Sequence, residues 1–236
     1  MKPVLVLQNL SADGPGYLGQ WLAERGVPMD VRNTEAGEHY PATLDGYAAL
    51  ALLGGEMSAN DPLPSLRAAE ALFLQAMQRG VPTIGHCLGA QLMARALGAA
   101  VTASPAPEVG WQTIDVADTP LAQDWLGDAG PRKVFHWHYE AFGLPPGAQA
   151  LARSSACRHQ AFAVGPHLAM QFHVEVDAAK LARWTAVDDP GARTRSQRLP
   201  SVQSFAEMRA DAQVHLEAHQ RLAQRVYARW LSAASD

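Results

Sequence analysis

The first hundred residues alternate between short apolar runs and segments with helical periodicity. Four apolar runs have the length of buried strands: PVLVLQN (3–9), VPMDVRN (27–33), YAALALL (47–53) and the run in VPTIGH (81–86). Helical patterns cover 17–25, followed by a stop signal at Gly26, and 64–79. Strands and helices that alternate in this way form parallel sheets with crossover helices. The sequence therefore predicts an α/β fold with a mostly parallel central sheet flanked by helices.

From about Val101 the pattern changes to shorter extended runs separated by turn signals. These runs are TIDVAD, KVFHWHYEAF, AQALARS, QAFAVG and LAMQFHVEV. They are typical of hairpins or of an added edge on the same sheet. A helical composition then covers about 201–233, long enough for two helices or one bent helix. We expect one domain over 1–236, with 190–236 as a helical C-terminal extension.

Composition and charge restrict the possible partners and location. Hydrophobic residues make up 48% and charged residues 18%, as in soluble globular proteins. The net charge of −4 leaves no basic excess for nucleic acid. The apolar run near the N-terminus is too short for a signal peptide, and no run reaches the ~18 residues needed to span a bilayer. We expect a cytoplasmic protein without a membrane partner, whose two cysteines, Cys87 and Cys157, remain reduced.

The pentapeptide Gly85-His86-Cys87-Leu88-Gly89 has the form of a sharp strand-to-helix turn that presents a nucleophile. Small residues flank such a turn because larger side chains would collide with the backbone. A thiol in the first helical turn also lies at the positive end of the helix dipole, which favours the thiolate. The plain alternative is a buried structural cysteine, which is how we interpret Cys157, since it lacks such a turn.

The segment QFHVEV (171–176) contains a possible base and a possible orienting acid. On an extended segment, residues two apart project to the same side, so Glu175 would lie beside His173. A nucleophile, a base and an orienting group are the parts that acyl transfer through a thiol requires.

Five segments together resemble the class I glutamine amidotransferases. They occur in that family's order and cover most of residues 45–180: LLGGEMSAND, GHCLGAQL, HWHYEAF, LPPGAQALARSS and QFHVE. The pattern is closest to stand-alone members, including those similar to gamma-glutamyl peptidases. The resemblance implies a flavodoxin-like single domain with extra small antiparallel strands and C-terminal helices, acting without a cofactor.

The resemblance also implies a catalytic triad. Cys87 would be the nucleophile, His173 the base and Glu175 its orienting acid. The family usually has proline between the histidine and the glutamate, whereas Val174 stands here. A turn without proline is less rigidly preset, so we expect weaker orientation of Glu175 but not its loss.

Further site residues follow from the same resemblance. Gly55 and Leu88 would supply N–H groups to an oxyanion hole, and Gln91 would help to hold the glutamate end of the substrate. The backbone near Trp137 and His138 would contact the glutamate moiety, although a strand with partly buried histidines explains this segment equally well.

Two histidines on one strand face also invite a metal interpretation. His136 and His138 flank Trp137, but no Cys, Asp or Glu stands at a supporting spacing, so we expect no metal site. Glu108 precedes a strand and carries only a weak expectation of a substrate role. His86 is expected to be a packed core histidine or, less readily, a second group near the sulfur.

Four functions are compatible with these features. The first is hydrolysis of the glutamine γ-amide, with ammonia passed to a synthase partner; that partner would be a separate chain, because the sequence has no Gly-rich phosphate loop. The second is hydrolysis or transfer of γ-glutamyl groups. An α/β-hydrolase is disfavoured, because there the acid precedes the histidine in the chain. A catalytically silent module that binds a small metabolite remains the non-enzymatic alternative.

Overall fold

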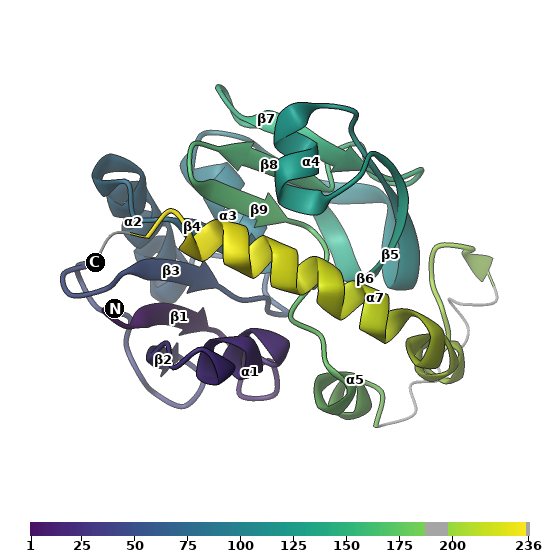
Figure 1. Cartoon of the computed structure of the whole chain (residues 1–236), viewed down its shortest axis with the longest axis horizontal. Coiled ribbons are helices and arrows are strands. Elements are labelled where there is room, and N and C mark those ends of the chain that lie inside the picture. The colour runs from purple at the N-terminus through teal and green to yellow at the C-terminus, as the bar shows by residue number, and fades with distance from the viewer. Residues whose placement is uncertain (187–197, 235–236) are drawn as a thin grey trace.

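One nine-stranded sheet runs through the protein, in a computed structural model that describes residues 1–186 and 198–234. The strand order is β2-β1-β3-β4-β9-β8-β7-β5-β6 (Figure 1). The parallel part consists of β1 (Val4–Gln8), β2 (Met29–Asn33), β3 (Ala49–Leu52), β4 (Thr83–His86) and β9 (His167–Met170). The predicted mostly parallel core is therefore confirmed, with β9 inserted beside β4 from much later in the chain.

The antiparallel part extends the same sheet. It consists of β8 (Ala161–Val164), β7 (Gln149–Arg153), β5 (Val101–Val116) and β6 (Gly130–Phe142). The ladder between β5 and β6 is the longest pairing and contains a register shift between Ala103 and Glu108. Four of the five expected short runs thus extend one side of the central sheet, while the fifth, LAMQFHVEV, begins as β9 in the parallel part.

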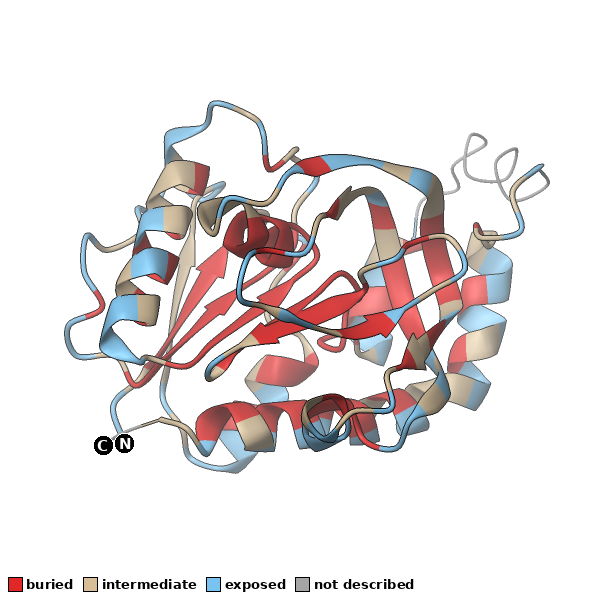
Figure 2. Ribbon diagram, turned by 90° about the horizontal axis from the view of Figure 1, so that it is seen from above, coloured by how far each residue is buried: buried red, intermediate tan, exposed pale blue. Residues whose placement is uncertain are grey.

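Helices cover both faces of the sheet, so that the strands are buried between two layers (Figure 2). On one face α1 (Tyr17–Glu24), α4 (Pro120–Leu126) and α7 (Phe205–Leu231) share an apolar cluster with the strands. On the other face α2 (Pro64–Arg79) and α3 (Leu88–Ala96) form a second cluster. Alternate residues of one strand enter different clusters, since neighbouring side chains of a strand point to opposite faces.

Four elements, α7, α4, α5 (Ala178–Trp184) and β9, differ from the predictions made from sequence. The tail is a single continuous helix, α7, which begins with a capping box at Ser204 and Glu207 and packs on the core; the expected boundary at 190 lies outside the described residues. The short helices α4 and α5 were not predicted. The predicted strand over 168–176 is wrong beyond Met170, where β9 ends and a turn begins.

Within the described part of the chain, no helix is both long enough and apolar enough to cross a membrane.

The α3 helix lies unusually close to the sheet at Gly89. A Cβ atom added there would lie 2.3 Å from the carbonyl oxygen of Leu52 and 2.7 Å from its carbonyl carbon. Both are backbone atoms of a central strand, so neither can rotate away. The absence of a side chain at Gly89 therefore sets the distance between α3 and β3.

Gly89→Ala is expected to lower the free energy of unfolding by about 2–3 kcal/mol, because the added methyl group forces helix and strand apart. Urea denaturation followed by tryptophan fluorescence measures this change. Gly143→Ala is the matched control, since its Cβ would meet nothing closer than 3.5 Å and its backbone is not strained. Equal stability of the two variants would contradict the close approach of α3.

Candidate functional site

Cys87 occupies the corner between β4 and α3. Its backbone has φ 49° and ψ −109°, and it is the one non-glycine residue with positive φ in the described ranges. Its N–H donates to the Met170 carbonyl at 2.8 Å, and its own carbonyl accepts from Gln91 N at 3.0 Å. Strained backbone of this kind, which costs about 1–3 kcal/mol, is concentrated at functional sites. The sharp turn that the sequence predicts at Cys87 is therefore present.

A pocket of about 760 Å³ opens beside this corner, within the size range of small-molecule sites. Six of the eight residues expected at the site line it: Gly55, Cys87, Gln91, Trp137, His138 and His173. Leu88 and Glu175 are buried and are not among the lining residues. The fold thus brings together segments that lie more than one hundred residues apart in the chain.

The His173 side chain is paired with Glu175. Nδ1 of the histidine lies 2.7 Å from Oε1 of the glutamate. They meet in a buried turn after β9 and not on a strand, so the alternation argued from the sequence is not the cause of the pairing. Long-range backbone bonds fix this turn: His173 N donates to Phe135 O at 2.9 Å, and Tyr17 N donates to Glu175 O at 2.9 Å.

A third contact reaches the same turn from the C-terminal helix. Nε2 of His219, on α7, lies 2.8 Å from the His173 carbonyl. Because a carbonyl only accepts, this nitrogen carries the proton. Burial lowers the pKa of His219 to about 4, so the imidazole is neutral at physiological pH.

The side chains of His173 and Cys87 both lie close to Gly54. A Cβ atom at Gly54 would lie 3.1 Å from Cε1 of His173 and 3.8 Å from Cβ of Cys87. Burial would lower the pKa of His173, but the charges of Glu175 and then of Cys87 raise it to about 10. Its Nε2, which Glu175 does not use, has no hydrogen-bond partner among the described residues. A protonated imidazole with a free N–H beside the thiol can deliver a proton to a leaving group.

Lys180 on α5 is completely buried beside the Glu175 carboxylate. Its Nζ lies 2.5 Å from Asp13 Oδ1, 2.8 Å from the Gly14 carbonyl and 3.3 Å from Glu175 Oε1. Burial alone would raise the pKa of Glu175, but the charges of Lys180 and then His173 hold it well below its usual value. The sequence analysis missed Lys180 and Asp13, because no local pattern indicates that two residues so far apart in the chain meet.

His86 is a packed core histidine, as expected. It is fully buried, its ring centroid lies 6.4 Å from that of Tyr227, and burial lowers its pKa. Its Nε2 lies 3.8 Å from the second carboxylate oxygen of Glu175. His86 is thus a neutral neighbour of the acid.

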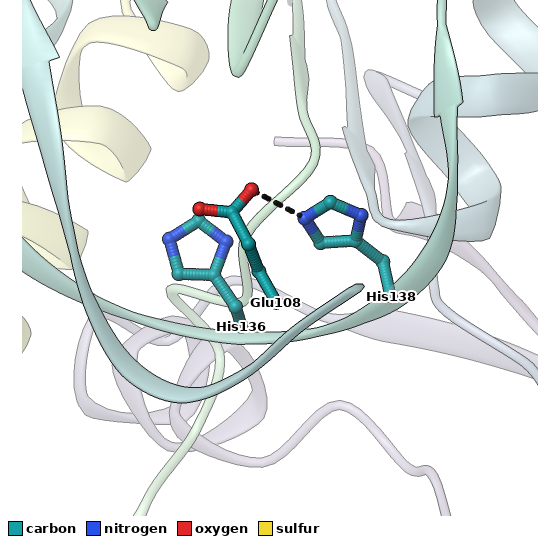
Figure 3. A group of neighbouring side chains, drawn as sticks. All are labelled: Glu108, His136 and His138. Atoms are coloured by element: carbon teal, nitrogen blue, oxygen red, sulfur yellow. Dashed lines mark hydrogen bonds and ion pairs between the residues drawn. The ribbon is translucent and has the colours of Figure 1, made fainter. Parts of the chain in front are cut away.

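The three expected substrate-binding residues, Gln91, Trp137 and His138, all line the pocket. The Cys87 thiol donates to the Trp137 carbonyl at 3.6 Å, and Gln91 Nε2 donates to the Glu140 carbonyl at 3.0 Å. The imidazole of His138 faces Glu108, with Nε2 3.1 Å from Oε2. The expectation that no acid supports the two histidines of this strand is therefore wrong: Glu108 lies directly opposite His138 in the ladder between β5 and β6 (Figure 3).

Comparison with known proteins adds independent information. The model of the family "Glutamine amidotransferase class-I" matches residues 17–182. The chain is 32% identical over 213 residues to the glutamine amidotransferase-like protein YfeJ of Salmonella typhimurium, which covers 85% of this chain and 86% of that protein. It is 36% identical over 185 residues to the GMP synthase of Aeropyrum pernix, where the match covers 72% of this chain but 35% of the synthase.

A solved structure agrees with these matches. The glutamine amidotransferase of Methylobacillus flagellatus has a TM-score of 0.94 and 37% sequence identity, with 100% of this chain and 96% of that chain covered. Sequence and fold agree over most of the chain, and it therefore belongs to the class I glutamine amidotransferase family.

Proposed function

We propose that this protein hydrolyses the γ-carboxamide of glutamine, or of a γ-glutamyl amide, through a thioester on Cys87. The observation that carries the proposal is the position of Cys87 on a strained corner, in one pocket with a histidine that a buried carboxylate holds. Nucleophile, base and orienting acid in this relation are what acyl transfer requires.

The proposed reaction has two steps. The Cys87 thiol gives its proton to Nε2 of His173 and its sulfur attacks the γ-carbonyl carbon. The developing oxyanion accepts hydrogen bonds from the N–H groups of Leu88 and Gly55, each contributing about 3 kcal/mol. His173 then gives its Nε2 proton to the departing ammonia or amine as the C–N bond breaks. Water adds to the thioester, His173 takes its proton, and glutamate leaves as the thiol is restored.

Charges around the pocket suit an amino acid substrate. Arg183 is the one lysine or arginine among the residues that line the pocket, and Glu56 and Glu140 line it as well. An α-carboxylate is matched by the guanidinium, and an α-ammonium group by the acids. The pocket volume exceeds what a single amino acid occupies, so a γ-glutamyl compound with a larger leaving group also fits.

That extra volume supports a second candidate function, the hydrolysis or transfer of γ-glutamyl groups of peptides. The GMP synthase similarity supports the first candidate, because that relative is named as glutamine-hydrolysing. The match covers 35% of that synthase, and transfer of the ammonia to a partner synthase is part of the first candidate. A silent metabolite-binding module is the non-catalytic alternative.

Cys87→Ser is expected to reduce turnover of glutamine to the background rate while the fold is retained, because the hydroxyl is a much weaker nucleophile. Release of glutamate and circular dichroism measure the two properties. Cys157→Ser is the matched control, since burial raises the pKa of that thiol to about 11 and Cys157 is not among the residues that line the pocket. A Cys87→Ser variant with the full rate would refute the nucleophile assignment.

A substrate panel separates the candidate functions. The purified chain is incubated with glutamine and with γ-glutamyl dipeptides while glutamate and ammonia are followed. Glutamate from dipeptides but not from glutamine would reject the ammonia-supplying function. No turnover of any substrate, together with no labelling of Cys87 by a glutamine-like electrophile, would favour the binding module.

Lys180→Met is expected to lower the free energy of unfolding by about 3–5 kcal/mol, because Asp13 and Glu175 lose the cation between them. Chemical denaturation measures the loss. Arg221→Met is the control: it removes an exposed ion pair with Glu217 on the surface of α7, and little change is expected. Similar stability losses in both variants would contradict the buried network.

A further inference from the structure

Glu108, His136 and His138 form a buried cluster on the β5–β6 ladder, and of the three only His138 also lines the pocket. Glu108 pairs in register with His138, and His136 is two residues earlier on the same strand face. The three side chains converge, with the Glu108 carboxylate between the two imidazole rings (Figure 3). None is more than 2% exposed. The proposed reaction uses neither Glu108 nor His136.

The hydrogen bonds of His138 direct the Nε2 lone pair toward a carboxylate oxygen of Glu108. Nδ1 lies 3.0 Å from the Glu140 carbonyl, which can only accept, so this nitrogen carries the proton. In the neutral imidazole Nε2 then presents a lone pair to Glu108 Oε2 at 3.1 Å. Two lone pairs at this distance repel each other. Either a proton between the two atoms or a metal cation resolves the contact.

The unpaired ring nitrogens of His136 favour a metal cation over a proton as the explanation of this contact. Both of its ring nitrogens are buried and have no hydrogen-bond partner among the described residues. A buried imidazole with neither nitrogen paired is costly, and a proton on His138 does nothing to satisfy it.

Gln160 adds a further unpaired atom at the same place. Its Nε2 donates to Glu108 Oε2, while its Oε1 is buried without a partner in the described part of the chain. Rotation of this amide by a half turn exchanges the two atoms and directs the oxygen toward the cluster. A fourth donor atom, the amide oxygen of Gln160, is therefore available beside the three primary side chains.

We propose that Glu108, His136 and His138 bind a divalent transition-metal ion, with Zn²⁺ the best match. Two imidazoles and one carboxylate are a ligand set that zinc accepts, with the fourth position taken by water or an amide oxygen. Magnesium and calcium prefer all-oxygen sites. One donor atom from each residue lies within 4.8 Å of the others, and bonds of about 2.0–2.1 Å require the donors to close by roughly 1 Å.

The hydrogen bond of His138 with the Glu140 carbonyl is typical of a histidine that binds a metal ion. Metal-bound histidines usually donate their other N–H to a carbonyl or carboxylate, as His138 does to Glu140. Trp137 lies between the two histidines, and its carbonyl accepts from the Cys87 thiol at 3.6 Å. An ion at the cluster would fix β6 at the two residues that flank this carbonyl. The ion thus has a structural role in the pocket wall and no part in the bond-making steps.

The test is a titration of the full chain, produced without a histidine tag and stripped with a chelator, with Zn²⁺ followed by calorimetry. One equivalent is expected to bind. His136→Gln and Glu108→Gln are each expected to weaken binding at least about 100-fold. The matched control His167→Gln changes another buried histidine, packed against Phe73 and outside the cluster, and is expected to bind as the unmodified chain does.

If a variant does not fold, the visible absorption spectrum of the unmodified chain with bound Co²⁺ tests the site instead. Four-coordinate cobalt with nitrogen and oxygen ligands is expected to show visible bands without sulfur-to-metal charge transfer. Cys87→Ser should leave binding unchanged, which separates this site from the proposed reaction. Failure of the unmodified chain to bind Zn²⁺, a sulfur charge-transfer band, or unchanged binding in His136→Gln would each overturn the proposal; the first outcome would mean that a proton, and not a metal ion, lies between His138 and Glu108.

Discussion

The backbone at Cys87 is held in a conformation that residues with side chains rarely adopt, and the contacts that hold it also build the pocket. The bond from Cys87 N to the Met170 carbonyl joins the corner to the last residue of β9. From Met170 the chain enters the turn that carries His173. The same pairing of β4 with β9 therefore fixes both the thiol and the approach of the imidazole. The close contact of Gly89 with Leu52 allows α3 to start directly behind the sulfur.

A balanced set of buried charges supports this arrangement. Two acids, Asp13 and Glu175, share Lys180, and His173 supplies a second cationic group. Each charge is costly to bury alone, but the partners compensate one another. The network also explains how the turn at Val174 keeps its shape without proline. Lys180 holds the Glu175 side chain, while Tyr17 at the start of α1 holds its carbonyl.

The sequence was most informative where structure is local. The strand-to-helix corner and the parallel strands follow from runs of a few residues, and the limits of α2 agree with the prediction. The pairing of His173 with Glu175 was predicted for the wrong reason, since a turn and not a strand brings them together. Lys180 and Glu108 could not be placed, because their partners come from other elements. The helices α4 and α5 have seven residues each, too few for a clear periodic signal.

The bond from His219 to the His173 carbonyl makes the last long helix part of the site's support. During synthesis on the ribosome, Cys87, His173 and Glu175 all emerge before residue 219 does. A nascent chain that already holds these three residues still lacks the helix that covers one face of the sheet and fixes the histidine backbone. The backbone of His173 therefore gains this support only after residue 219 has emerged, so the order of synthesis places the support of the histidine after the histidine itself.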